Sequence, residues 1–491
     1  TEIYTLSLHD ALPICSKEEK KAAQWIEAKI KPFCDEVHTE TFECHPRSFD
    51  GWPRFSVVMA LIAIAIFLTS LIGLHPIAAR ALSLAWIIFL FYAIWRQFFN
   101  YEEFIHRIFP YYKAQSQNIF GVFHAQQPPK RRIIFAAHYD SSFRFNLIQW
   151  TNVGYSFFII GGVTTLIIFT ITVVFSLIAV IWLVELIILL QLLKWVIILA
   201  NPIFLFVIFV VGKSPKMMFG ALASPSKKAS MVFILVGVYA LILSISLFAW
   251  LSSNFSFENL AIFTLLVNLP HLIALFLFLG RNAVIGALDN LSAVGVVFGI
   301  ADLIKNLNQE QKHNILQETE IIILFTGAEE AGDRGAEAFS KLHASEYNKI
   351  DTMVVNLESL TDSALQKIIV EEKTTRTKCD PRIYKLLGKA AEEMGIAYQF
   401  QALPEIAGGT DCAGFAKGGL AVSGLEGIRY SDYLQWYHSD RDNLDLINQD
   451  VRLDADNGKD YKTLNVRGSM TNALKICAKY IELCINGEKK N

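Results

Sequence analysis

Three stretches of the sequence decide the fold: 132–140 (RIIFAAHYD), 321–330 (IIILFTGAEE) and 353–358 (MVVNLE). Each begins with an unbroken apolar run of strand length that is rich in β-branched residues. Such runs are typical of strands buried on both faces of a parallel or mixed sheet. Each run then stops at side chains that can bind a metal ion. Because binding sites of open α/β sheets lie just beyond the carboxyl ends of the strands, we expect these three ends to converge on one site.

Two further stretches fit the same edge of the sheet: 286–290 (GALDN) at a predicted helix start, and 437–442 (YHSDRD) late in the chain. A single His at a strand end, a pair of Glu residues or an Asp before a helix is more often structural than functional. Ligand-type residues at five successive elements are much harder to explain in that way. The candidate metal ligands are His138, Asp289, Glu330, Glu358 and His438.

The composition indicates an integral membrane protein with a soluble part. Of the 491 residues, 53% are hydrophobic, which is more than globular proteins contain, and the excess is concentrated in blocks. The expected partner is therefore a lipid bilayer. The net charge of −2 offers no argument for a nucleic-acid partner. The seven cysteines are scattered without a C-x-x-C pair, which favours reduced thiols. The oligomeric state is left open.

The apolar blocks are expected to insert transmembrane helices into a soluble fold. Residues 55–98 contain two segments long enough to cross a bilayer, and 151–281 contain about four. In 152–212 the only charged residues are Glu185 and Lys194. The remaining segments, 15–54, 99–150 and 282–491, form one discontinuous domain. Its expected fold is a three-layer α/β/α arrangement around a mixed, mostly parallel sheet.

Within this domain the local patterns predict particular elements. Ser16 is a plausible N-cap for a helix over 16–30, because Glu19 follows three residues later. Residues 101–112 are predicted to form a surface helix. Strands are predicted over 37–44 and 117–123, and further helices near 290–307, 335–343 and 464–485. Residues 1–14 resemble the translation of a sequencing-library adapter and are excluded from the fold.

The order of the motifs constrains the topology. His138 precedes the second apolar block and Asp289 follows it, so each block must cross the membrane an even number of times if both residues share one site. Short loops rich in Lys and Arg favour the cytoplasm. Nine of these residues flank the expected domain side, whereas only Arg80 lies on the far side. We therefore expect a multi-pass protein whose soluble domain faces the cytoplasm.

The spacing of the candidate residues indicates how they could work together. His138 and Asp140 are two apart on a strand end, so they project to the same face, and Asp140 can orient a neighbouring group. Glu329 and Glu330 are adjacent, so their side chains diverge. Asp289 can bridge two cations through its two oxygens. With Glu358 and His438 these residues make two sites of mixed nitrogen and oxygen ligands, which suits a pair of zinc ions.

At these residues the sequence resembles the zinc exopeptidases that include bacterial leucyl aminopeptidases, glutamate carboxypeptidase II and glutaminyl cyclases. The resemblance covers roughly 16–46, 116–142 and 282–485. Its motifs are H-x-D at 138–140, GALDNxS at 286–292, EExGxxG at 329–335, NLE at 356–358, GTD at 409–411 and YHSxxD at 437–442.

The resemblance implies a membrane-anchored, zinc-dependent exopeptidase, most simply an aminopeptidase that removes N-terminal residues from peptides with a water activated by two zinc ions. It implies that His138 and Glu358 bind one zinc ion and that Glu330 and His438 bind the other. Asp289 bridges them, Glu329 is the general base, and Asp140 orients His138. The family pattern differs at Leu288, Glu358, Cys412 and Ala336, but none of these departures removes a ligand.

Three alternatives stay open. A glutaminyl-cyclase-like acyltransferase would need a single zinc ion, and a catalytically inactive relative would act as a binding protein. A transporter with a regulatory peptidase-like domain is supported mainly by His271 beside Pro270 in the last apolar segment. The complete set of five ligands and Glu329 favours a hydrolase over the first two. The third is less favoured because one His with isolated Glu185 and Lys194 makes a thin polar pathway.

Overall fold

The computed structural model describes residues 11–108, 112–151, 155–182, 256–404, 408–430, 433–448, 452–453 and 462–486. Within these residues, a nine-stranded sheet has the order β1-β2-β6-β3-β7-β11-β8-β10, with β9 beside β8. Its strands are β1 (Glu36–Cys44), β2 (Ala114–Phe123), β3 (Arg131–His138), β6 (Thr319–Thr326), β7 (Asp351–Glu358), β8 (Gln366–Glu372), β9 (Thr377–Lys378), β10 (Tyr398–Leu403) and β11 (Val422–Glu426).

The centre of the sheet is parallel. Strands β6, β3, β7 and β11 run in the same direction, whereas β1 pairs with β2 and β2 with β6 in antiparallel fashion. All eight residues of β3 are buried, as the apolar run in the sequence predicts. The mixed, mostly parallel sheet is confirmed, and the carboxyl ends of β3, β6 and β7 lie at one edge.

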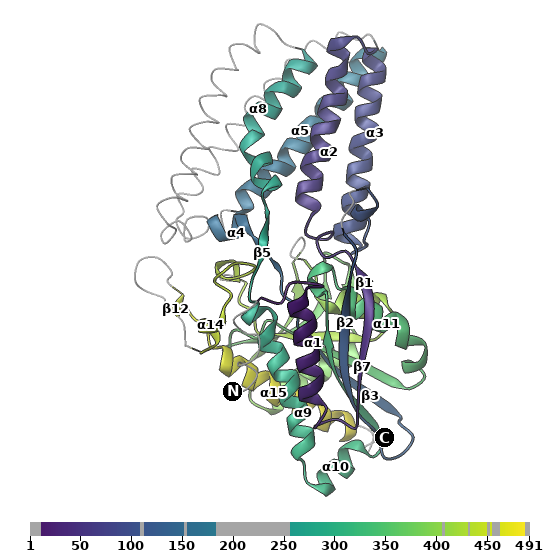
Figure 1. Ribbon diagram of the computed structural model, residues 1–491, viewed down its shortest axis with the longest axis vertical. Helices are drawn as coiled ribbons and strands as arrows, with labels where there is room; N and C mark the ends of the chain where they lie inside the picture. The colour runs from purple at the N-terminus through teal and green to yellow at the C-terminus, as the bar shows by residue number, and fades with distance from the viewer. Residues whose placement is uncertain are drawn as a thin grey trace.

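Helices cover both faces of the sheet, which confirms the α/β class. One core cluster joins the sheet to α1 (Lys17–Ile30), α9 (Ser292–Asn306), α12 (Pro381–Glu393) and α15 (Val466–Asn486). A second cluster on the opposite face joins it to α11 (Arg334–Tyr347) and α13 (Asp411–Lys417). Figure 1 shows α1, α9 and α15 on one side of the strands and α11 on the other. The shorter helices are α4 (Asn146–Thr151), α10 (Gln309–Leu316) and α14 (Leu444–Asn448).

The N-terminal part of the domain forms as its sequence predicts. The side chain of Ser16 accepts a hydrogen bond from the backbone N–H of Glu19 and caps α1. Leu12 and Ile14, within the segment excluded on sequence grounds, are buried here, whereas residues 1–10 lie outside the described part. All seven cysteines are described and none forms a disulfide.

Four long apolar helices extend from one end of the α/β domain (Figure 1). They are α2 (Trp52–Leu68), α3 (Pro76–Ile94), α5 (Tyr155–Trp182) and α8 (Phe257–Phe276). Among the described residues, five helical segments are long and apolar enough to cross a membrane. The fifth, Ala287–Asn306, includes α9 and packs in the core of the sheet. The spans predicted between residues 183 and 255 lie outside the described residues.

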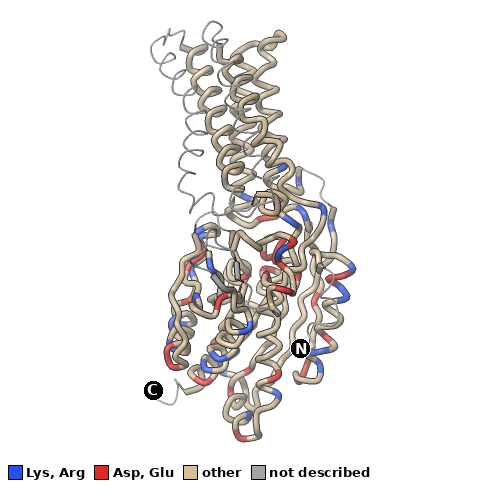
Figure 2. Tube along the Cα trace, turned by 90° about the vertical axis from the view of Figure 1, so that its left-hand side faces the viewer, with Lys and Arg blue, Asp and Glu red and all other residues tan. Residues whose placement is uncertain are grey.

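The four apolar helices alternate in direction, as the topology argument requires. Helices α2 and α5 leave the domain, and α3 and α8 return to it (Figure 1). At the far end, the Arg80 guanidinium lies 2.7 Å from the Glu258 carboxylate and joins the starts of α3 and α8. Figure 2 shows charged residues gathered over the α/β domain, while the described helices above it are almost free of them.

Two basic residues fix the helices to the domain. Arg47 donates hydrogen bonds to the carbonyls of Gly280 and Arg281, and Arg54 donates to the carbonyls of Phe276 and Leu279. The last carbonyls of a helix lack partners within the helix, so Arg54 satisfies the end of α8. The base of the bundle is therefore held by hydrogen bonds as well as by packing. Just beyond α8, β5 (Leu279–Ala283) pairs with β4 (Phe143–Phe145).

The predicted surface helix over 101–112 is wrong for most of its described length. Only Ile105–Arg107 is helical, as a single 3₁₀ turn. Tyr101 is buried with a φ of 52°, a left-handed conformation that interrupts a helix. The side chain of Gln97 then accepts the backbone N–H groups of Phe104 and Ile105, so side-chain hydrogen bonds replace helical ones.

His271, the residue that favoured a transporter, lies inside the helix bundle. Its ring centroid is 4.8 Å from that of Phe157 on α5, and the residue is 1% exposed. A Cβ on Gly161 would lie 2.1 Å from the His271 ring, so glycine is required for this close packing. The ring is enclosed by packed side chains of α5 and α8, and neither of its nitrogens has a hydrogen-bond partner among the described residues.

Candidate metal centre

The five candidate ligands meet at the carboxyl edge of the sheet, although they come from five separate segments. His138 ends β3 and Glu358 ends β7. Glu330 follows β6 in a short 3₁₀ turn, and Asp289 lies in the irregular turn before α9. His438 enters from the segment after β11. All five side chains are buried, with exposed fractions between 1% and 7%.

The ligands form two adjoining triads. Nε2 of His138 lies 3.3 Å from Oδ1 of Asp289 and 3.5 Å from Oε1 of Glu358. Nε2 of His438 lies 3.5 Å from Oδ2 of Asp289 and 3.2 Å from Oε2 of Glu330. The two oxygens of Asp289 therefore face one histidine each, which places this carboxylate between the two triads.

These distances fit zinc. Ligand atoms 2.0–2.1 Å from a tetrahedral ion lie about 3.3 Å apart, which is the separation of the donor atoms here. Four buried atoms that face the centre have no hydrogen-bond partner among the described residues: Nε2 of His138, Nε2 of His438, Oε1 of Glu330 and Oε2 of Glu358. Since an unpaired buried polar atom is costly, these atoms are suited to hold a metal ion.

The electrostatics support the same interpretation. Burial lowers the pKa of His438, but the carboxylates of Glu330 and Asp289 outweigh this and raise it to about 10. Burial raises the pKa of Glu358 to about 7, although His138 opposes the shift. The centre thus holds several buried carboxylates with two imidazoles between them. Divalent cations would balance this excess of negative charge.

Asp140 holds the neighbouring Glu-Glu turn. Its Oδ1 accepts the backbone N–H of Glu329 at 3.1 Å, and its Oδ2 accepts that of Glu330 at 3.2 Å. The His138 ring faces the Asp140 backbone carbonyl, with Nδ1 3.2 Å from that oxygen, while the Asp140 carboxylate is 3.6 Å away. Asp140 therefore contacts His138 chiefly through its backbone carbonyl. Its carboxylate instead positions the Glu329–Glu330 turn at the end of β6.

Further residues around the ligands fix their directions. Asp442 accepts the backbone N–H groups of Leu288 and Asp289 at 2.6 and 3.2 Å. Nδ1 of His438 lies 3.0 Å from Oγ of Ser142, and its ring stacks on Tyr437 with centroids 3.7 Å apart. Ligand orientation by such partners strengthens metal binding. The sequence motif included Asp442, but nothing in the local pattern marked Ser142.

Asn290 connects two of the ligand-bearing segments. Its side-chain amide donates to the carbonyl of Leu357 at 3.0 Å, and its oxygen accepts the N–H of Ser359 at 3.0 Å. These two bonds flank Glu358 on both sides. Asn290 therefore does more than start a helix. Its side chain ties the segment that carries Asp289 to the end of β7.

Glu329 stands apart from both triads. Its Oε2 lies 3.8 Å from Nε2 of His138, and it makes no part of either ligand group. Burial raises the pKa of Glu329 well above its usual range; His138 opposes this shift and nearby carboxylates add to it. A carboxylate of raised pKa beside a metal site is suited to accept and return a proton.

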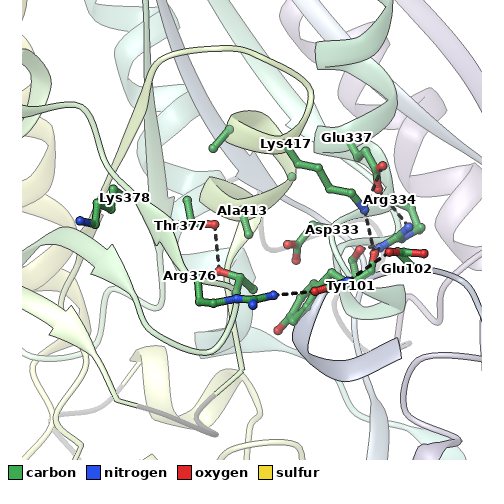
Figure 3. Close-up of a pocket in the computed structure, with 15 residues that line it drawn as sticks. Tyr101, Glu102, Asp333, Arg334, Glu337, Arg376, Thr377, Lys378, Ala413 and Lys417 are labelled. Carbon is green, nitrogen blue, oxygen red and sulfur yellow. Dashed lines mark hydrogen bonds and ion pairs between the residues drawn. The ribbon is translucent and has the colours of Figure 1, made fainter. Parts of the chain in front are cut away.

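A cavity of about 460 Å³ opens beside the Glu-Glu turn. Figure 3 shows Asp333 at its centre, with Arg334, Glu337 and Lys417 on one side and Arg376 on the other. Asp333 is 2% exposed and neither of its carboxylate oxygens has a hydrogen-bond partner among the described residues. Sequence reasoning missed this cavity, because its walls come from segments far apart in the chain.

A mixed sheet with a cluster of zinc-type ligands at its carboxyl edge is the arrangement expected of α/β metal-dependent hydrolases. Residues 272–456 match the sequence model of peptidase family M28, so this part of the chain is similar to that family. The matched region includes four of the five ligands, and His138 lies before it.

Solved structures with similarity to the chain are distant. The LapA aminopeptidase of Legionella pneumophila is 16% identical, with a TM-score of 0.32, and the match covers 41% of this chain and 47% of that one. The aminopeptidase of Aneurinibacillus sp. strain AM-1 is 10% identical, with a TM-score of 0.44, covering 98% and 92%. A glutaminyl cyclase of Bacteroides thetaiotaomicron bound to N-acetylhistamine is 10% identical, with a TM-score of 0.44, covering 98% and 94%. No curated protein sequence matches the chain.

Proposed function

We propose that the protein is a membrane-anchored aminopeptidase that uses two zinc ions to hydrolyse N-terminal residues of peptides. The observation that carries this proposal is the pair of triads joined by Asp289. His138 and Glu358 would hold one ion, and Glu330 and His438 the other. Zinc ions held by these residues would polarise the substrate carbonyl and lower the pKa of a bound water.

The remaining residues supply the proton transfers. Glu329 would accept a proton from the attacking water and later deliver it to the leaving amine. The backbone N–H of Glu329 is held by Asp140, which fixes the position from which the side chain reaches the centre. Asp140 acts here as a positioning residue for the Glu329–Glu330 turn. The cavity around Asp333 begins at Gly332, where this turn ends, and none of the five candidate ligands lines it.

The two triads help to distinguish hydrolysis from the two alternatives, an acyltransferase and an inactive binding protein. A mononuclear acyltransferase requires only one complete triad, yet here each has three buried ligand residues. A binding protein without activity would not need Glu329 buried beside the ligands. The arrangement therefore supports hydrolysis over transfer or simple binding.

Membrane anchoring is proposed from the four apolar helices that extend from the domain. Their exposed residues include large apolar side chains, among them Leu61, Leu82, Ile88 and Ile273. Such a surface is unfavourable in water and suited to lipid. The domain and its metal centre then lie on one side of the membrane.

We expect that side to be the cytoplasm, because basic residues cluster at the domain end of the bundle. A cysteine placed at Lys113 should react with an impermeant maleimide only after lysis, whereas one placed at Ile72, which is 84% exposed at the far turn, should react in intact cells. The unmodified protein, whose own cysteines are buried or half-buried, is the control. The opposite labelling pattern would reverse the orientation.

The activity itself is tested with the full chain in detergent. Aminoacyl fluorogenic peptides should be cleaved, and peptides with a blocked N-terminus should not. A chelator should abolish cleavage, and added zinc should restore it. Cleavage of blocked peptides alone would indicate another exopeptidase specificity, and cleavage that survives chelation would contradict the metal mechanism.

A further inference from the structure

Arg334 joins the Glu-Glu turn to the segment that leaves the apolar hairpin formed by α2 and α3. Its Nε donates a hydrogen bond to the carbonyl of Gly332 at 2.6 Å, and its Nη2 donates to the carbonyl of Tyr101. Gly332 ends the turn, and Tyr101 lies just beyond the helical segment that continues α3 to Phe99. One side chain therefore contacts both the turn beside the metal centre and the exit of the hairpin (Figure 3).

The third nitrogen of the Arg334 guanidinium is held as well. Nη1 lies 3.0 Å from Oε2 of Glu337, and the two side chains are 11% and 8% exposed. Lys417, at the end of α13, lies 3.1 Å from the other oxygen of Glu337 and also donates to the carbonyl of Tyr101, at 3.1 Å. The Tyr101 carbonyl thus accepts two cationic donors that share one buried carboxylate. Since charge-assisted hydrogen bonds are strong, these contacts fix the position of Tyr101 relative to the turn.

The Glu-Glu turn needs such contacts because its backbone is unfavourable. Ala328 before it and Asp333 after it have φ values of 54° and 59°, in the left-handed region that non-glycine residues rarely adopt. Conformations of this kind persist only where the surrounding structure holds them. Asp140 accepts the N–H groups at the start of the turn, and Arg334 binds the carbonyl at its end. Both ends of the turn that presents Glu329 are therefore held by side chains.

The segment that enters the hairpin contacts the same turn. Phe49 lies between β1 and α2, and a Cβ on Gly332 would lie 2.8 Å from its ring, so the ring packs directly on the turn. The centroid of the Phe49 ring is also 4.6 Å from that of Tyr101, which is 4% exposed. The segments that enter and leave the hairpin are therefore packed together against the turn.

We propose that Arg334 is a positioning residue that couples the α2–α3 hairpin to the general base Glu329. The hairpin fixes Phe49 and Tyr101, and Arg334 relates their position to Gly332. The turn then sets where the Glu329 side chain stands beside the metal centre. Arg334 belongs to neither triad, so it acts through the turn and not on the substrate. This inference rests on the role proposed for Glu329, and it gives the hairpin a part in catalysis in addition to anchoring.

Arg334→Gln should lower kcat by about 10²-fold, because a small misplacement of a catalytic group has an effect of this size. KM and zinc per chain should stay close to those of the unmodified protein, since no ligand is changed. Arg334→Lys should recover only part of the rate, because an ammonium cannot reproduce the planar, forked contacts of a guanidinium. Arg376→Gln is the matched control. Arg376 donates to the side chain of Asn100 at 2.6 Å, in the same segment, but has no hydrogen bond to the turn among the described residues, so kcat should be unchanged.

Hydrogen exchange followed by mass spectrometry tests the coupling without requiring turnover. In Arg334→Gln the backbone amides of 328–333 should exchange faster, whereas in Arg376→Gln they should exchange as in the unmodified protein. Phe49→Leu, which loosens the hairpin side, should also speed exchange in 328–333. Its effect should be smaller when Arg334→Gln is already present, because substitutions that act through one contact network are not additive.

The outcomes separate this inference from the proposed activity. Unchanged exchange in 328–333 of Arg334→Gln would overturn the coupling, as would independent effects of the two substitutions. A loss of zinc in step with the loss of kcat would also overturn it, because Arg334 would then support the ligands in general. If Arg334→Gln does not fold, exchange in Arg334→Lys and Phe49→Leu decides. If the unmodified protein cleaves no aminoacyl peptide, the proposed activity fails while the exchange rates still test the coupling.

Discussion

Replacing Glu329 by Gln should abolish peptide hydrolysis while leaving zinc binding and folding nearly intact. Glu329 lies outside both triads, and its backbone N–H is held by Asp140 regardless of the side chain. Glutamine keeps the shape of the side chain but cannot accept a proton. Loss of a general base typically lowers a rate by about 10²–10⁴-fold, and a larger loss is expected where the same group also protonates the leaving amine. The measurements are turnover at saturating zinc and zinc per chain.

Glu330→Gln is the matched comparison, because it makes the same change one residue further on. Its Oε2 lies 3.2 Å from Nε2 of His438 within a triad, so this variant should lose metal first and activity as a consequence. Added zinc should rescue Glu330→Gln in part and Glu329→Gln not at all. If Glu329→Gln turns over normally, or loses zinc as Glu330→Gln does, the two roles have been assigned wrongly.

The convergence of His138 and Glu358 was predictable from the sequence, because each of these residues ends a buried apolar run. In β3 and β7, apolar residues continue without interruption until His138 and Glu358. Such an abrupt change has few structural explanations in a buried strand. Since parallel strands share one carboxyl edge, the convergence of these ends followed from the class of sheet alone.

The order of the strands was not predictable in the same way. Strands β2 and β3 are neighbours in the sequence, yet β6 lies between them in the sheet. Strand order depends on long-range packing, and local patterns carry no information about it. The cavity around Asp333 and the partner role of Ser142 were missed for the same reason, because each joins segments that are distant in the chain.

Apolar composition also has a limit as a predictor. The segment Ala287–Asn306 is apolar enough to cross a membrane, but 72% of it is buried inside the protein, against 33% of Pro76–Phe99. Both patterns satisfy the length requirement. The two helices differ in what they pack against. Helix α9 packs on the sheet, whereas α3 has Ile88 and Phe91 exposed. Only the fold distinguishes a helix buried in the core from one with an exposed apolar face here.

Replacing Asp289 by Ala should remove both zinc ions and with them all measurable hydrolysis. Asp289 is the one ligand that belongs to both triads, with one oxygen toward each histidine. The loss of activity should be at least about 10³-fold, because metal ions contribute several kcal/mol to stabilising the transition state. The turn itself should persist, because Asp442 holds it through the backbone N–H groups of Leu288 and Asp289.

The decisive comparison is the effect of a chelator on the melting temperature. A ligand that binds only the folded state stabilises it, so chelation should lower the melting temperature of the unmodified protein. The Asp289→Ala variant has less metal to lose and should respond much less. Asp302→Ala, on the exposed side of α9, is the control and should behave like the unmodified protein. If Asp289→Ala keeps two zinc ions and the full response to chelator, Asp289 does not bridge the triads, and each ion must be held by the remaining ligands alone.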